Sequence, residues 1–418
     1  MHSNRFSSGA NMLNDGFFKD IENLETEMIT ALSDLLRIPA IAPESGGDGE
    51  LVKAEKLMQL LAAIGFDRIE RFDANDSRVT SGKRPNIIAT LNGETEGRLW
   101  IVTHLDVVPP GEESMWHVTK PFEPKVAGDR VFGRGAEDNG QSLVSSLYSA
   151  VALRRLGVNP KRTLCLAFVA DEEMGSVFGI QHLIAKGLFK KDDLIVVPDG
   201  GQADGSFIEV AEKSLFWFRV RSIGKQTHGS RPDKGLNAHR IGMEVALELD
   251  HRLHEKFDKR DEFFDVPNST FEPTMKEKNV DAVNIVPGED IFYFDCRVIP
   301  SYNVDDVVAE VERVLREFEQ KTGAKITMEI VQKQPAPKLL NGGAEIVKML
   351  KSALKQARGI DARVGGIGGG SCAAFFRKQG IPAALWSTVD DVPHQPDEYC
   401  KTANMVADAK IFALLATM

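Results

Sequence analysis

The feature that most constrains the fold of this chain is a set of short apolar runs that alternate with helical patterns in its first half. The runs are NIIATL, RLWIVTH, TLCLAFVA and DLIVVPD. LCLAFVA is apolar on both faces of a strand, which is typical of a strand covered by helices on either side. Helical spacing of apolar residues extends over 21–37, 49–64, 140–156 and 176–187. We therefore expect an α/β domain with a mostly parallel central sheet flanked by helices.

The pattern changes near residue 214, where LFWFRVRSI alternates like a half-exposed strand. A helix over 237–256, a charged loop over 257–280, NIVPG, the strand IFYFDCRVI, a helix over 304–321 and the run KITMEIV follow. The order β-α-β-β-α-β predicts a small ferredoxin-like α+β domain.

The α/β pattern resumes after about residue 335. It comprises a helix over 342–357, the stretch GGIGGGS, the strand IPAALWS and a last helix over 402–416. We therefore predict a discontinuous larger domain formed by residues 1–213 and 335–418, with the smaller domain, residues 214–334, inserted into it.

Composition excludes several classes of protein. The net charge of −10 argues against non-specific nucleic-acid binding, which needs a basic surface. The four cysteines are scattered and form no CxxC pair, so we expect neither a disulfide framework nor a thiolate zinc site. The first residues, MHSNRFSSGANMLNDGFF, lack the apolar core of a signal peptide, and no stretch approaches the length of a membrane span. The expected location is the cytoplasm, with no membrane partner.

Polar residues follow the predicted strands at the points where those strands end. In open α/β sheets, sites form at the carboxyl ends of the strands. Taken singly, each segment could be a strand-end turn, a helix cap or a solvated acidic loop. The candidates are His104 and Asp106 after WIVT, Asp138 in GRGAEDNG, Asp171, Glu172 and Glu173 after LCLAFVA, Asp199 after LIVVP, and His394 in PHQPDE.

Together these residues supply two imidazoles and several carboxylates. Three acids packed at the end of a buried strand are costly unless a cation lies among them, and a metal is the natural partner. The set suits a dinuclear zinc centre with a bridging carboxylate, one histidine per metal and one terminal carboxylate per metal. Asp106 lies two positions after His104 and can orient its imidazole. Glu172 remains as a general base for an attacking water.

The ordered motifs HLDVVPPG, GRGAEDNG, DEEMGS, PDGG, QTHGSRPDKGLNA and PHQPDE resemble the zinc aminoacylase and carboxypeptidase family. That family includes acetylornithine deacetylase, succinyl-diaminopimelate desuccinylase, glutamate carboxypeptidase, and di- and tripeptidases. The resemblance covers nearly all of the chain after residue 20. It implies two Zn²⁺ per chain, with Co²⁺ or Mn²⁺ as possible substitutes. It also implies a catalytic domain of residues 1–213 and 335–418, and a lid and dimerisation domain of residues 214–334 in a homodimer.

The resemblance also implies roles for individual residues. One ion would be held by His104, Asp138 and Asp199, and the other by His394, Asp138 and Glu173. Asp106 would orient His104, and Glu172 would be the general base.

In the lid, His228 resembles the family histidine that stabilises the tetrahedral oxyanion in the partner subunit's site. Asn284 and Arg297 match lid positions that contact the substrate. Gly369, Gly370 and Ser371 resemble the loop whose backbone faces the substrate carboxylate.

The expected reaction is hydrolysis of the amide bond of an N-acyl amino acid or a short peptide by metal-activated water. A deacylase of the acetylornithine deacetylase or succinyl-diaminopimelate desuccinylase kind is favoured by the short lid. The alternative is a di- or aminopeptidase or a carboxypeptidase of the same family, which is favoured by Asp199 and by CAAFF after GGGS. Two other classes are a non-catalytic binding module, which would have lost a ligand or the base, and an NAD-dependent oxidoreductase, for which no GxGxxG follows an early strand.

Overall fold

The computed structural model describes residues 15–337, 339–340 and 342–418. Most of the leading segment, for which we predict no signal peptide, lies outside this part of the chain. The described chain folds into two compact units. The first contains the residues up to Val210 together with Leu340–Val364 and Ser371–Met418, and the second contains Ala211–Leu339 and Gly365–Gly370. The short segment 365–370, which we place in the larger domain from the sequence, therefore belongs to the second unit.

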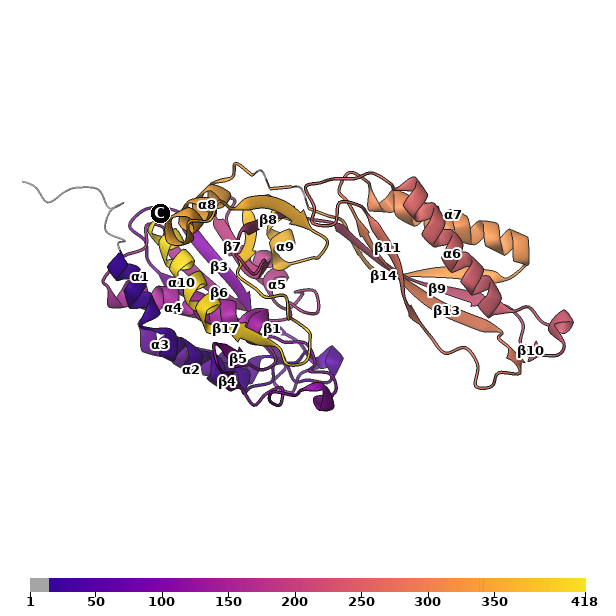
Figure 1. The fold of residues 1–418 in the computed structure, drawn as a ribbon, viewed down its shortest axis with the longest axis horizontal. Coiled ribbons are helices and arrows are strands. Elements are labelled where there is room, and N and C mark those ends of the chain that lie inside the picture. Colours follow the sequence, from indigo (N-terminus) through magenta and orange to yellow (C-terminus); the bar gives the residue numbers. More distant parts are fainter. Residues whose placement is uncertain (1–14, 338, 341) are drawn as a thin grey trace, which may run out of the picture. The chain divides into compact units, whose positions relative to one another are not determined.

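An eight-stranded sheet forms the centre of the first unit (Figure 1). Its four middle strands, β6, β3, β7 and β16, run parallel. On one side of these four strands, β2 pairs antiparallel with β6, and β1 pairs antiparallel with β2. On the other side, β8 pairs antiparallel with β16. In spatial order the strands are β1 (Arg68–Asn75), β2 (Lys83–Leu91), β6 (Thr163–Val169), β3 (Arg98–His104), β7 (Leu194–Gly201), β16 (Ala383–Ser387), β8 (Phe207–Glu212) and β15 (Arg363–Ile367).

Helices cover the sheet of the first unit on both sides, which confirms the predicted α/β class. Helices α5 and α9 bury apolar side chains against β3, β6 and β7. Helices α4 and α10 contact each other and also contact β3. The bounds are α1 (Asp15–Glu22), α2 (Glu25–Leu36), α3 (Leu51–Ile64), α4 (Ser142–Arg155), α5 (Ile180–Ala185), α8 (Glu345–Arg358), α9 (Cys372–Lys378) and α10 (Thr402–Thr417), with shorter turns at Pro43–Ser45, Glu113–Met115 and Ala136–Gln141.

A small three-stranded sheet joins two segments that are distant in the sequence. Strand β17 (Tyr399–Lys401) pairs antiparallel with β5 (Arg130–Phe132), which pairs with β4 (Lys125–Ala127). This pairing places the chain that follows PHQPDE beside the chain that leads into GRGAEDNG.

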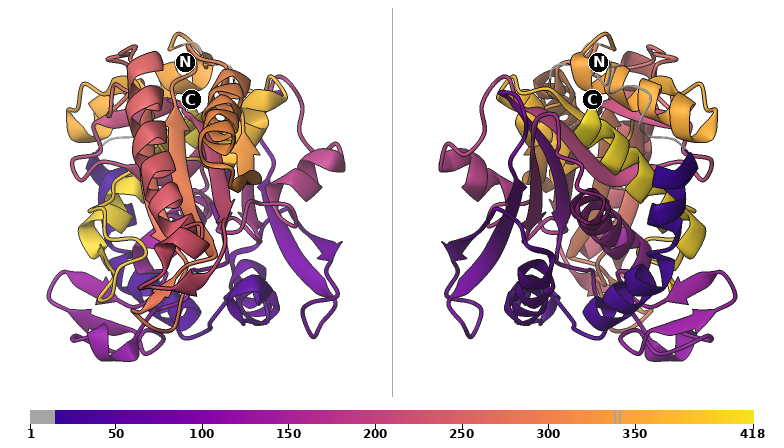
Figure 2. Two further views of the ribbon diagram at one scale, coloured as in Figure 1. Left: turned by 90° about the vertical axis from the view of Figure 1, so that its right-hand side faces the viewer. Right: turned by 90° about the vertical axis from the view of Figure 1, so that its left-hand side faces the viewer.

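The second unit is an antiparallel sheet covered by two helices. The strand order is β11 (Thr270–Lys276), β13 (Glu289–Val298), β9 (Ser214–Ile223) and β14 (Lys325–Gln334). Helices α6 (Ala238–Lys256) and α7 (Val304–Thr322) lie side by side along it (left view of Figure 2). The core between the layers is rich in phenylalanine, with Phe218 and Phe294 stacked at 5.3 Å. Short strands β10 (Thr227–His228) and β12 (Ile285–Val286) and the turn Pro232–Lys234 lie outside the main sheet.

This arrangement is the expected ferredoxin-like topology, but its second strand is not where the sequence places it. The predicted loop 257–280 contains β11, and NIVPG contributes only the two residues of β12. Strand β11 lies at the edge of the sheet, it contains Pro273, and its last five residues are exposed. Such an edge strand carries no alternating apolar pattern, which is why its sequence resembles a loop. None of the helices in the described ranges is long and apolar enough to cross a membrane.

Candidate active site

His104 is the last residue of the central strand β3, and its imidazole is buried. Its Nδ1 lies 3.0 Å from the backbone oxygen of Asp106 and 3.5 Å from a carboxylate oxygen of the same residue. Because the backbone oxygen can only accept, the proton of a neutral ring lies on Nδ1, and Nε2 is left with a free lone pair. Asp106 thus lies within reach of Nδ1 of His104, and its main-chain oxygen is a nearer partner than its carboxylate.

Asp138 follows the glycine-rich turn before α4, and its two oxygens face different histidines. Oδ1 lies 2.8 Å from Nε2 of His104, and Oδ2 lies 3.1 Å from Nε2 of His394. Asp199, at the end of β7, places Oδ1 3.4 Å from the same nitrogen of His104. Glu173 places Oε2 3.2 Å from Nε2 of His394. The five predicted ligands thus form two groups of three that share Asp138.

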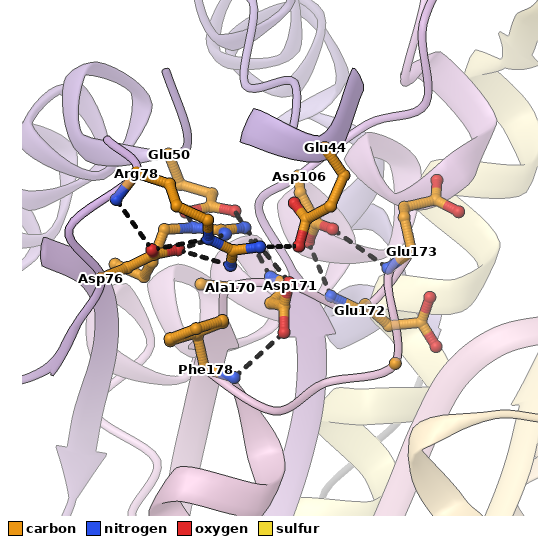
Figure 3. A network of polar contacts seen from close by, with 12 residues as sticks. Glu44, Glu50, Asp76, Arg78, Asp106, Ala170, Asp171, Glu172, Glu173 and Phe178 are labelled. Carbon is orange, nitrogen blue, oxygen red and sulfur yellow. Dashed lines mark hydrogen bonds and ion pairs between the residues drawn. The ribbon is translucent and has the colours of Figure 1, made fainter. Parts of the chain in front are cut away.

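Glu172 and Glu173 lie on the loop that follows β6, and the side chain of Asp106 binds the backbone of this loop. The carboxylate of Asp106 is fully buried and accepts hydrogen bonds from the backbone N–H groups of Glu172 at 3.1 Å and Glu173 at 3.0 Å. In Figure 3 the side chains of both glutamates point away from Arg78 and Asp76, which lie on the opposite side of the picture. Ligand atoms of Glu172, His104 and Asp199 all lie within 4.8 Å of one another. Glu172 therefore lies beside one of the two ligand groups.

Two further carboxylates, which the sequence analysis missed, connect the segments that carry Asp138 and His394. Glu398 is fully buried and accepts from the backbone N–H groups of Gly135, Glu137 and Asp138 at 2.9–3.0 Å, while Arg134 pairs with it at 2.6 Å. The side chain of Glu137 accepts hydrogen bonds from two backbone N–H groups of the loop that leads to His394.

Asn139 is a third missed residue, and it positions Asp199. Its Nδ2 donates to the backbone oxygen of Pro198 and to Oδ1 of Asp199, both at 2.8 Å. The only sequence signals for Glu137, Asn139 and Glu398 are their places beside predicted ligands, within GRGAEDNG and PHQPDE.

The pKa values of the cluster show a shortage of positive charge. Burial raises the pKa of Glu173 to about 7, with Asp138 adding to the effect, and burial also raises the pKa values of Glu172 and Asp199. Hydrogen bonds to Asp138 and Glu173 raise the pKa of His394 to about 10. Glu172, Glu173 and Asp199 are thus drawn toward neutrality and His394 toward protonation, whereas hydrogen bonds to the two histidines lower the pKa of Asp138 despite its burial.

A metal ion fits these residues. Oε1 of Glu173 is buried without a hydrogen-bond partner among the described residues. A divalent cation would use that oxygen, neutralise the acids and take the free lone pairs of both histidines. The donor set of imidazole and carboxylate is one that zinc, cobalt and manganese accept.

In the second unit, the predicted residues His228 and Asn284 lie beside each other. His228 pairs with Ile285 in the β10–β12 ladder, and the backbone oxygen of Asn284 accepts from Gly229 at 2.7 Å. His228 is exposed, and its Nδ1 accepts the backbone N–H of Ser230 at 3.1 Å. The proton of the neutral ring is therefore on Nε2, which faces outward as a donor.

Arg297 is already engaged within the second unit. Its guanidinium donates to both carboxylate oxygens of Asp295, at 2.6 and 2.9 Å, and to the backbone oxygen of Gly368 at 3.1 Å. A substrate carboxylate would have to compete with Asp295 for the same two-pronged contact.

The predicted glycine-rich substrate loop is divided between the two units. Gly369 and Gly370 belong to the second unit, and Ser371 begins the last segment of the first. Ser371 caps α9, since its Oγ accepts the backbone N–H of Ala373 at 3.1 Å.

The fold and the paired ligand groups define a class of protein: a metal-dependent hydrolase with an α/β catalytic unit and a ferredoxin-like second unit. The sequence profile of peptidase family M20/M25/M40 matches residues 100–418, well over half of the chain. The protein therefore belongs to this family, and the resemblance identified from its motifs is confirmed.

Two relatives and one solved structure show the range of this likeness. A protein of Methanocaldococcus jannaschii described as an uncharacterized metallohydrolase is 38% identical over 93% of this chain and 98% of its own length. Succinyl-diaminopimelate desuccinylase of Wolinella succinogenes is 28% identical over 90% of this chain and 95% of its own. The structure of the dipeptidase Dug1p from Saccharomyces cerevisiae covers 96% of this chain and 97% of its own, with a TM-score of 0.78 and 17% identity.

Proposed function

We propose that this protein hydrolyses the amide bond of an N-acyl amino acid, as a deacylase of the acetylornithine deacetylase or succinyl-diaminopimelate desuccinylase kind, with two zinc ions per chain. The observation that carries the proposal is the position of Asp138, whose two oxygens face His104 at 2.8 Å and His394 at 3.1 Å. A carboxylate with a different histidine on each oxygen would belong to the ligand sets of both ions.

The residues that would hold the ions follow from the two groups. His104, Asp138 and Asp199 would hold one, and His394, Asp138 and Glu173 would hold the other. When bound, a pair of ions in such a site polarises the scissile carbonyl and makes water a better nucleophile at neutral pH.

Glu172 would move the proton in this reaction. It lies beside His104 and Asp199, it is left over by the two proposed ligand groups, and burial raises its pKa well above the ordinary value for glutamate. A carboxylate in this position takes a proton from the attacking water and passes it to the nitrogen of the leaving amine. Its backbone is fixed by Asp106, so the side chain starts from a defined position.

The experiment that tests the proposal compares wild-type protein with the Glu172→Gln variant. We expect both proteins to bind about two zinc ions per chain by plasma emission, and we expect kcat of the variant to fall by roughly 10²–10⁴-fold. Substrates are a panel of acetyl- and succinyl-amino acids set beside dipeptides. A variant as active as the wild type would refute the role of Glu172, and a fully active protein without metal would refute the whole mechanism.

The same panel separates the two candidate functions. The sequence identity of 28% with a desuccinylase, over 90% of this chain, supports the deacylase function. The structural likeness to a dipeptidase extends to the fold alone. Strong cleavage of dipeptides without turnover of acyl amino acids would make the protein a di- or aminopeptidase or a carboxypeptidase.

We also propose that the protein is a cytoplasmic homodimer that pairs through its second unit. Strand β14 is an edge of the four-stranded sheet and exposes Ile330 and Val331 by 42% and 54%. An edge strand that exposes apolar side chains can serve as a template for strand pairing with another chain. Light scattering should give twice the mass of one chain, and Ile330→Lys should give a monomer. The four cysteines are free and buried, as suits a reducing compartment.

A further inference from the structure

Four successive backbone N–H groups after strand β6 are held by side chains from other parts of the first unit. Ala170 donates to Asn86 at 3.1 Å, and Asp171 donates to Glu50 at 3.3 Å. The next two donors, Glu172 and Glu173, bind Asp106. The loop that carries the proposed base and a proposed ligand is therefore fixed at each residue by a buried acceptor (Figure 3).

The acceptor for Asp171 is itself fixed by Arg84. The guanidinium of Arg84 and the carboxylate of Glu50 are both fully buried. Nε of Arg84 donates to Oε2 of Glu50 at 2.6 Å, and Nη2 pairs with Oε1. The same Nη2 lies 3.4 Å from a carboxylate oxygen of Asp171. The guanidinium of Arg84 thus contacts both Glu50, which binds the backbone of the loop, and Asp171, the first acid of the loop.

The conformation of Asp171 shows why this support is needed. Its φ is +64°, in the left-handed region that residues with a side chain seldom adopt. Its carboxylate accepts the backbone N–H of Phe178 at 3.0 Å, which closes the loop, and the guanidinium of Arg84 lies 5.5 Å from the centre of the Phe178 ring. Arg84 and Asn86 project from the same face of β2, since they lie two positions apart.

We propose that Arg84 is a positioning residue, which acts through Glu50 and Asp171 to hold Glu172 and Glu173 in register with the two ligand groups. This inference rests on the proposed function. Without the guanidinium of Arg84, the buried carboxylates of Glu50 and Asp171 would repel each other and lose their shared partner. The loop would then relax. Glu173 would then leave the group that it forms with His394, whereas His104 and Asp199 are held from other strands.

The test replaces the guanidinium of Arg84 while keeping a positive charge at that position. Arg84→Lys retains a cation, but a single ammonium group cannot pair with Glu50 in two-pronged fashion and also reach Asp171. Arg78→Lys is the matched control, because Arg78 belongs to the same cluster, pairs with Asp76 and Glu44, and has a half-exposed side chain. Unfolding temperatures of both variants would establish whether they are folded.

The readout is the binding of Co²⁺ to metal-free protein, followed by calorimetry and by the visible spectrum of the ion. We expect Arg84→Lys to weaken one of the two sites by about 10–100-fold, as loss of a partner behind a ligand typically does, and to leave the other site unchanged. Arg78→Lys should bind both ions like the wild type. On a cleaved substrate, Arg84→Lys should lower kcat with little change in KM.

Wild-type affinity at both sites in a folded Arg84→Lys variant would overturn the proposal, as would equal weakening of both sites. If that variant does not fold, Glu50→Gln applies the same test, since the amide oxygen can still accept from Asp171 while the charged pair with Arg84 is lost. A wild-type protein that binds two ions and cleaves no acyl amino acid or peptide would refute the proposed function alone, because the titration uses no substrate.

Discussion

The carboxylate of Glu398 accepts the backbone N–H of Asp138 at 3.0 Å, so a residue near the end of the chain holds the proposed bridging ligand. The same carboxylate binds two other N–H groups of that turn and is fully buried. A buried acceptor with three donors and an arginine partner defines the path of the backbone around it.

Glu398→Gln tests this relationship. The amide keeps one oxygen, but its NH₂ group would face backbone N–H donors, so at least one of them loses its partner, at a cost of about 1–3 kcal/mol. We expect a lower unfolding temperature and weaker metal binding at both sites, because Asp138 is shared. Calorimetric titration with zinc measures the effect. If only one site weakened, Glu398 would not be acting through the bridging residue.

Removal of metal should lower stability as well as activity. The pKa of Glu173 is raised toward neutrality and that of His394 toward protonation, and a bound cation would reverse both effects. Each ion that binds only the native state adds about 2.7 kcal/mol at a free concentration one hundred times its Kd. We expect chelator-treated protein to be inactive and to unfold at a lower temperature than zinc-loaded protein. Equal unfolding temperatures would contradict a metal site at these residues.

His228→Ala should reduce the rate without changing metal content. The ring is exposed and its Nε2 is available to donate, while Nδ1 is occupied by the backbone of Ser230. Loss of one donor to a developing oxyanion typically lowers kcat by about 10²–10³-fold. Steady-state kinetics on the best substrate of the panel checks this, with metal analysis as the control. Kinetics like those of the wild type would remove His228 from the catalytic machinery.

Asp408 should make stability depend on pH. Burial raises the pKa of this carboxyl, on α10, to about 7, while in the unfolded chain it titrates near 4. The native state therefore binds a proton that the unfolded state releases, so the stability that it provides is full below about pH 4 and is lost as pH rises toward 7. Asp408→Asn mimics the protonated form and should reduce this decline. Melting curves of both proteins at several pH values make the comparison. An identical pH dependence in both proteins would exclude Asp408 as the source of the decline in stability.

Much of the architecture was predictable because it depends on local patterns. LCLAFVA is apolar on both faces, and the strand that it forms is buried on both faces of the sheet. The helical patterns likewise correspond to α3, α4, α6 and α7 within a few residues. Strand β11 could not be identified in this way, because an exposed edge strand with a proline does not need alternating apolar residues.

The sequence by itself determined the α/β class, the ferredoxin-like second unit and a set of candidate metal ligands, because burial periodicity and ligand chemistry can be read from neighbouring residues. Only the tertiary structure decided which oxygen of Asp138 faces which histidine, that Asp295 pairs with Arg297, and that Arg84 contacts Asp171 in the loop that carries Glu172. Arg134 and Glu398 pair across 264 positions of the chain. The partner of a buried charge is chosen by the packing of distant segments, and no local pattern encodes that choice.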